Sequence, residues 1–522
     1  MKRYAWLIFA AIICVFFMTS AAASEPAEAE ALPFTLEASD AADADISALA
    51  DEDETSYTKI PAGGSVTLTA ESGISSLYVL FDRIYGKWTL SDGVTDIVCG
   101  TNEYLHEYID VEHEFGYAPS SLTLTFRSRD CSLSELYAFG AGDVPPWVQI
   151  WEPPCEEADL ILASTHIDDE QLFFAGVLPY YAGELGLDVQ VVYFTSPFTY
   201  HERQHEQLNG LWTVGVRHYP VSGEFRDAYS ENAKDAYEDQ TGFGFTRDDM
   251  VLFQVRIIRR FRPHVVVGHD INGEYSHGQH IINCETLMDA LDLAADETFD
   301  PESAAEYGVW DTPKTYIHLW EENPIVMDWD IPLESFGGKT AFQVTQDGFR
   351  CHKSQQWTWF RRWIYGKNNE ITKASEIKTY SPCLYGLYRT TVGLDVSGGD
   401  MFENIPQSYA EIRAEEARRE EESRAESERV ESERIESERA ESERLRLEEE
   451  SRRAEESRLA ALADSSASGS KDSDGTDKKG ISPVTAGVVI AALSAAIVIT
   501  IPQIRQNNGS KKRRNHGGSR RT

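Results

Sequence analysis

Two clusters of histidine and acidic residues occupy similar positions in the sequence pattern. The first, His166-Ile-Asp168-Asp169-Glu170, follows the apolar run Leu160-Ile-Leu-Ala-Ser. The second, Gly273-Glu-Tyr-Ser-His277-Gly-Gln-His280, follows Phe261-Arg-Pro-His-Val-Val-Val-Gly-His-Asp270. Imidazole nitrogens and carboxylate oxygens together suit Zn²⁺ or a similar divalent metal. Because a further Asp beside such a metal can accept a proton from water, these residue types predict metal-assisted hydrolysis.

Each cluster stands between a predicted buried strand and a predicted helix. Apolar residues recur at helical spacing in Gln171-Leu-Phe-Phe-Ala-Gly-Val-Leu and in Ile281-Ile-Asn-Cys-Glu-Thr-Leu-Met. In an open α/β sheet, sites form outside the carboxyl ends of the strands. The alternative is structural, because acidic residues are common in the first turn of any helix. The second cluster favours a metal site with ligands from two strand ends.

The two clusters resemble motifs of the PIG-L/LmbE-like N-acetylglucosaminyl deacetylases. The first is similar to that family's Ala-His-Pro-Asp-Asp-Glu motif, and the second to its Gly-Glu-x-x-His-Pro-Asp-His motif. Three further elements match in order, and these are Arg203-x-x-Glu206, His352-x-Ser354-Gln355 and Tyr385-Gly-Leu-Tyr-Arg-Thr-Thr-Val-Gly-Leu-Asp. The resemblance covers roughly Glu152 to Ile405. It rests on the order and spacing of the motifs together.

The resemblance implies a zinc-dependent hydrolase and a role for each matched position. His166, Asp169 and His280 would bind Zn²⁺, although two histidines and an aspartate suit Fe²⁺ as well. Asp168 would be the general base. The remaining implied residues are His277, which would stabilise the oxyanion or protonate the leaving amine, and Arg203, which would help to hold the substrate.

The sequence departs from the family pattern at two places. Thr165 and Ile167 replace Ala and Pro around the first histidine, where neither residue normally binds metal. Gly278-Gln279 replaces Pro-Asp in the second motif. We interpret the missing Asp as the residue that would hold His277 in its cationic form, which Gln279 cannot do by charge. This departure supports an alternative function, a non-catalytic glycan-binding surface protein with a degenerate deacetylase fold.

The whole chain has 522 residues and a formal net charge of −39, which implies more than one domain and argues against a nucleic-acid partner. We predict an α/β fold class for the catalytic part, a Rossmann-like parallel sheet, because strands and helices alternate. The predicted segments are a signal peptide (1–23), an acidic disordered segment (24–54), a β-sandwich (55–143), the deacetylase domain (150–405), a charged helical stalk (408–463), a flexible linker (464–482), a transmembrane helix (483–502) and a basic cytoplasmic tail (503–522).

The two ends of the chain predict export and anchoring. The N-terminus has a basic start, an apolar core and the small residues Ala21-Ala-Ala, which favour a cleaved signal peptide over a signal anchor. The uncharged apolar run at 483–502 precedes Lys511-Lys-Arg-Arg514, and this basic flank places the C-terminus in the cytoplasm. The prediction is a type I, single-pass protein of the cell membrane with an extracellular ectodomain.

Short alternating strands separated by Gly, Asp, Asn and Ser predict the β-sandwich, which loosely resembles carbohydrate-binding modules. Tyr85, Trp88 and Tyr104 are the candidate exposed aromatics for glycan contact, although aromatic residues in strands more often belong to the core. Residues 198–248 are polar and aromatic and predict loops around the site. The six cysteines after the signal peptide permit disulfides such as Cys99–Cys131 and Cys351–Cys383, with six free thiols as the alternative.

The predicted stalk repeats the pattern Glu-Ser-Glu-Arg with a period of five residues. Glu and Arg at spacings of three and four support a helix. The apolar positions step by five, so no heptad seam persists, and a solvated single helix is favoured over a coiled coil.

The sequence as a whole predicts hydrolysis of the N-acetyl group of an N-acetylglucosamine-type sugar. Because the enzyme is predicted to be exported, a surface or extracellular glycan is the expected substrate. An amidase for a different acyl group is a further alternative.

Overall fold

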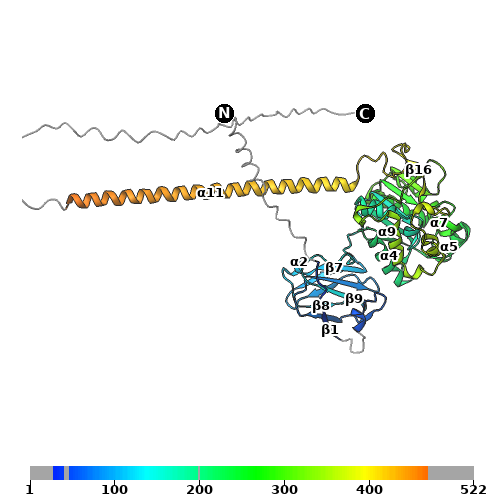
Figure 1. Cartoon of the computed structure of the whole chain (residues 1–522), viewed down its shortest axis with the longest axis horizontal. Helices are drawn as coiled ribbons and strands as arrows, with labels where there is room; N and C mark the ends of the chain where they lie inside the picture. Colours follow the sequence, from blue (N-terminus) through cyan, green and yellow to red (C-terminus); the bar gives the residue numbers. More distant parts are fainter. Residues whose placement is uncertain (1–27, 40–45, 198–199, 468–522) are drawn as a thin grey trace, which may run out of the picture. The chain divides into compact units, whose positions relative to one another are not determined.

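The computed structural model describes residues 28–39, 46–197 and 200–467 (Figure 1). The predicted signal peptide, transmembrane helix and basic tail all lie outside these residues. Among the helices that are described, none combines the length and the apolar character that a membrane span requires. The chain divides into two compact units, residues 1–425 and residues 426–522.

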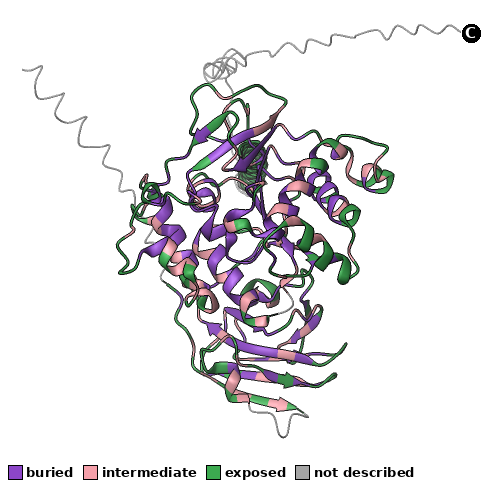
Figure 2. Ribbon diagram, turned by 90° about the vertical axis from the view of Figure 1, so that its right-hand side faces the viewer, coloured by how far each residue is buried: buried purple, intermediate pink, exposed green. Residues whose placement is uncertain are grey.

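Two antiparallel sheets form the N-terminal part of the first unit (Figure 2). The five-stranded sheet has the order β1 (Phe34–Ser39), β3 (Ser65–Ala70), β8 (Ser121–Thr125), β5 (Trp88–Ser91) and β6 (Asp96–Cys99). The four-stranded sheet has the order β2 (Thr58–Ile60), β9 (Cys131–Phe139), β4 (Ser76–Phe81) and β7 (His106–Asp110). Alternate side chains of β3 and β8 are fully buried against the four-stranded sheet, in one core with Leu77 and Val79. We call these two sheets the sandwich.

Two predictions for this region are wrong. The disorder predicted for residues 24–54 does not extend over Phe34–Ser39, which pairs with β3 in regular antiparallel register. The alternation of Phe34, Leu36 and Ala38 with polar residues was the available signal for this strand. The candidate exposed aromatics Tyr85, Trp88 and Tyr104 are all buried. Their size and rigid shape fill the core, so they offer no open surface to a glycan.

A seven-stranded mixed sheet forms the second part of the unit. Strands β12, β11, β10, β13 and β14 are parallel, and β16 pairs antiparallel with both β14 and the edge strand β15. The strands are β10 (Leu160–Ser164), β11 (Val189–Thr195), β12 (Val221–Phe225), β13 (Val265–Gly268), β14 (Lys314–His318), β15 (Pro324–Val326) and β16 (Leu384–Thr390). The α-helices are α3 (Asp169–Leu172), α4 (His201–Thr213), α5 (Ala233–Gly242), α6 (Arg247–Phe261), α7 (Gly278–Ala294), α8 (Pro301–Tyr307), α9 (Ala341–Cys351) and α10 (Trp359–Tyr365). The predicted α/β class and mostly parallel sheet are therefore confirmed.

The central strands β10 and β13 are direct parallel neighbours, with Ala163 opposite Gly268. Both strands are buried throughout, as expected for a parallel sheet covered on both faces (Figure 2). Their carboxyl ends consequently emerge side by side. The polar clusters that follow β10 and β13 in the sequence are brought together at this edge.

The prediction of loops for residues 198–248 is wrong for the described part of that segment, which contains α4, β12 and α5. Helix α4 escaped detection because much of its buried surface is polar, including Gln204, His205, Glu206 and Gln207. A helix buried through polar contacts lacks the hydrophobic periodicity from which an amphipathic helix is predicted. The cysteines of the described residues are all free thiols, so the suggested disulfides do not form.

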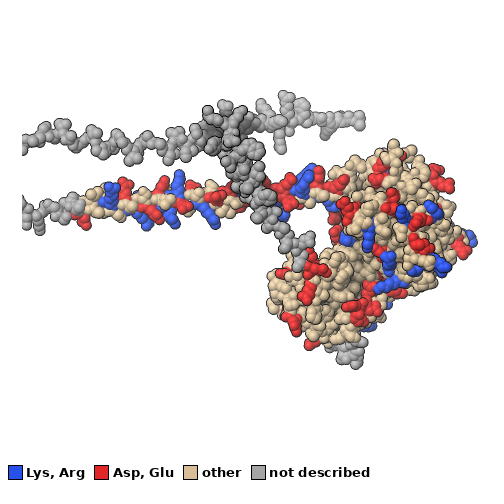
Figure 3. Space-filling view, viewed as in Figure 1, with Lys and Arg blue, Asp and Glu red and all other residues tan. Residues whose placement is uncertain are grey.

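Helix α11 (Tyr409–Ala467) confirms the helix predicted for the charged repeat. A helix of 59 residues spans about 88 Å at ~1.5 Å per residue. Acidic and basic side chains alternate along it (Figure 3). Arg434, for example, lies 2.6 Å from a carboxylate oxygen of Glu431 and 2.5 Å from one of Glu438. Such pairs at spacings of three and four support an exposed helix without a tertiary core.

His218 lies just before β12 and contacts Pro153 and Asp188. Its positive charge makes the free energy of unfolding depend on pH. Its Nδ1 lies 2.8 Å from the Pro153 carbonyl oxygen and its Nε2 lies 3.2 Å from an Asp188 carboxylate oxygen, so both nitrogens face acceptors. Burial alone would lower the pKa of His218, but contacts with Cys155, the Pro153 carbonyl and Glu152 outweigh burial and raise the pKa to about 9.

We expect the stabilisation by His218 to be fully present below pH ~6.5, the ordinary histidine pKa, and to be lost as the pH rises through about 9. The Tm difference between the wild type and His218→Gln should therefore shrink over this range when thermal unfolding is followed from pH 6 to pH 10. The exposed His113→Gln is the matched control, and its difference should be small throughout. A His218→Gln difference that stays constant with pH would contradict the expectation.

Candidate metal centre

The turn after β10 presents two of the predicted ligands. The backbone N–H of His166 donates to Asp169 Oδ2 over 2.8 Å, which closes the turn. Asp168 has a φ of 119°, a left-handed region that residues other than glycine rarely adopt. Its backbone N–H donates to Glu170 Oε2 over 2.9 Å. These two hydrogen bonds hold a strained turn that points the side chains of His166 and Asp169 inward.

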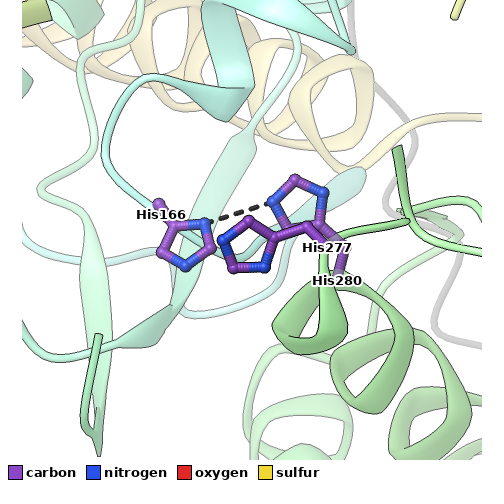
Figure 4. Close-up of side chains that lie close together, drawn as sticks. All are labelled: His166, His277 and His280. Carbon is purple, nitrogen blue, oxygen red and sulfur yellow. Dashed lines mark hydrogen bonds between the residues drawn. The ribbon is translucent and has the colours of Figure 1, made fainter. Parts of the chain in front are cut away.

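His280 meets these residues from the first turn of α7. His166 Nδ1 lies 3.1 Å from Asp169 Oδ2 and 3.2 Å from His280 Nε2, and His280 Nε2 lies 3.2 Å from Asp169 Oδ2. The three atoms form a nearly equilateral triangle, which we call the ligand triangle. Figure 4 shows the close approach of His166 and His280, with the ring of His277 beside them. The structure thus brings together all three predicted metal ligands.

The ligand triangle fits a divalent metal ion. Ligand atoms ~2.0–2.1 Å from a tetrahedral Zn²⁺ are separated by about 3.3 Å, close to the distances observed here. Burial lowers the pKa of His280, but Asp169 and Glu274 outweigh burial and raise the pKa to about 10. The carboxylates therefore favour positive charge at this point. Two histidines and one carboxylate leave further coordination positions open, as in catalytic sites.

Glu274, to which the sequence reading gave no role, is the hub of a buried histidine network. Its Oε2 accepts from His280 Nδ1 over 2.7 Å and from His269 Nδ1 over 2.9 Å, and its Oε1 accepts from His318 Nδ1 over 2.6 Å. Burial would raise the pKa of Glu274, but these histidines hold that pKa well below its ordinary value. Because His280 donates through Nδ1, its Nε2 is left as the free ligand atom.

Asp168 lies beside the ligand triangle with its side chain buried. Its Oδ2 is 3.5 Å from Arg203 Nη2. Burial raises the pKa of Asp168 to about 7, with Asp169 and Glu170 adding to the rise and Arg203 opposing it. A buried carboxylate with a pKa near neutrality is suited to accept and release a proton.

Arg203 is half-buried and its guanidinium group forms ion pairs with Asp168 and Asp227. It donates to the Ile167 carbonyl oxygen, and its Nη1 lies 3.5 Å from Asp227 Oδ2. It therefore positions the turn that carries Asp168. The neighbouring motif residue Glu206 accepts from the backbone N–H and the hydroxyl of Ser354, each over 2.6 Å. The matched elements around Arg203 and Ser354 thus meet in space.

The side chain of Gln279 is directed to His166 and not to the ring of His277. Its Oε1 lies 2.7 Å from His166 Nε2 and accepts from the Ala228 backbone N–H over 3.1 Å. The side chain consequently orients His166, leaving His166 Nδ1 to the ligand triangle. Gln279 reaches His166 because it lies in the first turn of α7, which faces the turn after β10.

His277 accepts a hydrogen bond through one ring nitrogen, which assigns its proton to the other. Its Nδ1 accepts from the Gln279 backbone N–H over 3.2 Å, so the neutral ring carries its proton on Nε2. Burial holds the pKa of His277 well below its ordinary value, with His166 and His280 acting in the same direction. Its ring stacks on His280 with centroids 4.6 Å apart, so Nε2 is available near the ligand triangle.

Exposed aromatic rings border the histidines. Tyr229 makes an edge contact with His277, with centroids 5.2 Å apart, and Trp359 makes one with Tyr275 at 5.4 Å. Tyr229 is 64% exposed and Trp359 is 46% exposed. These rings, which the sequence reading did not single out, supply flat apolar surface at the rim of the site.

No protein-family model matches the chain, but individual proteins do. A 1D-myo-inositol 2-acetamido-2-deoxy-alpha-D-glucopyranoside deacetylase of Saccharopolyspora erythraea is 29% identical over 270 residues, which cover 47% of this chain and 88% of that protein. A protein of the same description from Catenulispora acidiphila is 29% identical over 198 residues, 34% of this chain and 58% of that relative. A mycothiol S-conjugate amidase of Streptomyces coelicolor is 31% identical over 130 residues, 25% of this chain and 38% of the amidase.

Among solved structures, N,N'-diacetylchitobiose deacetylase from Pyrococcus horikoshii matches 45% of this chain and 85% of its own chain, with 14% identity and a TM-score of 0.33. A pectin-binding carbohydrate-binding module matches 22% of this chain and 96% of its own, with 13% identity and a TM-score of 0.16.

Proposed function

We propose, from the homology of this chain to the PIG-L/LmbE-like N-acetylglucosaminyl deacetylases, that it is a metal-dependent N-deacetylase acting on an N-acetylglucosamine-type sugar. The observation that carries the proposal is the ligand triangle of His166, Asp169 and His280, with the buried carboxylate of Asp168 beside it. The similarity to two proteins described as deacetylases of a 2-acetamido-2-deoxy sugar supports the choice of an acetamido substrate.

The ligand triangle would hold Zn²⁺ or a similar ion, which supplies Lewis acidity for the hydrolysis of an amide. Asp168 accepts a proton from the attacking water and passes it to the departing amine. The Nε2–H of His277 donates to the oxygen on which negative charge develops. Arg203 holds the Asp168 turn through the Ile167 carbonyl and the ion pair with Asp168. The products are the free amino sugar and acetate.

The proposed substrate is a glycan at the cell surface or outside the cell. This setting is supported by the predicted signal peptide and transmembrane helix, and by the long charged helix α11, which suits a stalk. Tyr229 and Trp359 offer apolar faces on which a sugar ring can pack beside the acetamido group. The sandwich can add a glycan contact, but not through Tyr85, Trp88 or Tyr104, which are buried.

Metal content and acetate release measured on the same purified full chain test the proposal. We expect about one catalytic metal per chain and acetate release from N-acetylglucosamine oligosaccharides or inositol-linked N-acetylglucosamine. N-propionyl and N-butyryl analogues distinguish a deacetylase from a broader amidase. His280→Ala is expected to lose both this metal and the turnover. Metal binding without turnover on any acylated amino sugar would instead favour the non-catalytic glycan-binding alternative.

A further inference from the structure

A second group of potential metal ligands lies where the sandwich meets helix α4. Glu54, His106 and His205 each place one ligand atom within 4.8 Å of the others. His106 Nε2 lies 2.7 Å from His205 Nδ1, and both histidines are almost completely buried. None of these three residues belongs to the ligand triangle. Two imidazoles and one carboxylate are nevertheless the same donor set.

The three residues come from segments that are far apart in the sequence. His106 begins β7 of the sandwich, His205 lies in α4, and Glu54 follows a short 3₁₀ helix, Ile46–Ala50. The surrounding contacts hold them in place. Tyr78 Oη lies 2.9 Å from His106 Nδ1, and Asn209 Nδ2 donates to Glu54 Oε2 over 2.9 Å. The cluster is therefore built into the interface between sandwich and α/β sheet.

One nitrogen in the cluster lacks a protein partner. His205 Nε2 is buried but has no hydrogen bond within the described residues. Buried polar atoms in proteins are nearly always paired, so the ring of His205 is incompletely satisfied where it stands, with only Nδ1 bonded to His106. Burial also lowers the pKa of His205 and of His106, which keeps both rings in the neutral form that binds metals.

The charged side chains around the cluster permit a cation to bind there. Glu54 supplies a carboxylate, and the buried Asp82 lowers the electrostatic cost of positive charge at His205. Lys353 opposes this, since its Nζ lies 3.5 Å from Glu54 Oε1. The Lys353 side chain is 74% exposed, however, and can turn into solvent.

We propose that Glu54, His106 and His205 bind a second divalent ion, Zn²⁺ or a chemically similar metal, which fastens the sandwich to helix α4. The ion would be held by His106 Nε2 and His205 Nδ1, so binding replaces the hydrogen bond between these two atoms. Ligands of a tetrahedral ion are about 3.3 Å apart, so the rings must separate by about 0.6 Å. Two residues before His205, Arg203 holds the turn of the catalytic site, and one residue after it Glu206 binds Ser354. The second ion would thus stabilise the helix that positions Asp168.

Zinc stoichiometry of the purified full chain, measured by mass spectrometry of the metal after dialysis, tests the proposal. We expect two Zn²⁺ per chain for the wild type and one for Glu54→Gln and for His205→Asn. Glu54→Gln is the main variant, because the amide retains the shape and the oxygen that accepts from Asn209 while losing the charge. The exposed sandwich variant His113→Gln is the control and should retain two.

Asp169→Asn separates this site from the catalytic one. In that background we expect one Zn²⁺, lost on adding Glu54→Gln, with at least a tenfold rise in its Kd. Added Zn²⁺ should raise the Tm of Asp169→Asn and do so much less after Glu54→Gln, because an ion that binds only the folded chain stabilises it. A wild type that binds one Zn²⁺, or a second Zn²⁺ that survives both Glu54→Gln and His205→Asn, would overturn the proposal. Neither result depends on turnover, so failure here is distinct from failure of the proposed deacetylase function.

Discussion

Replacing Asp168 with Asn is expected to lower kcat by about 10²- to 10⁴-fold while the metal content of the catalytic site stays the same. Asp168 is buried beside the ligand triangle, with Arg203 3.5 Å from its Oδ2. An amide fills the same space but cannot accept the proton of the attacking water. Asn is also the better substitution for the backbone, since it tolerates the left-handed region in which the φ of 119° lies. Acetate release under saturating substrate and metal analysis of the same sample measure the two effects.

Asp169→Asn is the matched control for this experiment. It changes the adjacent carboxylate in the same way, but Asp169 Oδ2 is a corner of the ligand triangle. We expect this variant to lose the catalytic metal and its activity together. The assignment of Asp168 as the base fails if Asp168→Asn retains wild-type kcat, or if it loses metal to the same extent as Asp169→Asn.

The ligand triangle could be predicted from sequence because its residues follow strands with strong local signals. His166 and Asp169 come directly after the apolar run of β10, and His280 opens the helix after β13. Because β10 and β13 pair in parallel, the two clusters that follow them lie side by side at the same edge of the sheet. Local pattern and topology therefore predict that the two clusters meet, whereas the choice of His166, Asp169 and His280 as ligands came from the family resemblance.

The support around the triangle could not be predicted, because it depends on side-chain contacts between distant residues. Glu274 reaches His318, 44 residues away at the end of β14, and Gln279 reaches His166 from α7. No periodicity encodes such contacts. The same limit explains the missed helix α4, whose buried face carries Gln204, His205 and Glu206, since polar residues in a sequence window normally indicate exposure.

Buried aromatic residues illustrate the opposite error. Trp88 and Tyr85 carry polar atoms that suit a sugar, but these atoms are already used inside the sandwich. Trp88 Nε1 donates to Glu107 over 2.7 Å, and Tyr85 Oη donates to the Arg129 carbonyl oxygen over 3.1 Å. The polar atom of a Trp or Tyr side chain can form its hydrogen bond inside the protein core as well as with a ligand. The sequence alone does not distinguish these uses.

Glu274→Gln is expected to weaken both metal binding and folding, although Glu274 is not a predicted ligand. The carboxylate accepts from His269, His280 and His318, whereas an amide can accept only through its single oxygen and turns its NH₂ toward the remaining histidine. Loss of the partner that orients His280 should reduce metal affinity by about 10- to 100-fold. Breaking a buried charged network should also lower the free energy of unfolding by about 3–5 kcal/mol.

Metal titration and denaturant unfolding of the full chain measure these two effects. Asp270→Asn is the appropriate control, because Asp270 is also buried beside the site but bonds to Asn272 instead of to a histidine. We expect its metal affinity to stay near the wild-type value. The order of the effects is informative, since Glu274→Gln should weaken the metal site while Asp168→Asn leaves it intact and stops turnover. If Glu274→Gln keeps wild-type metal affinity, His280 does not need the Glu274 carboxylate to keep Nε2 free for the metal. The orienting role that we assign to Glu274 is then wrong.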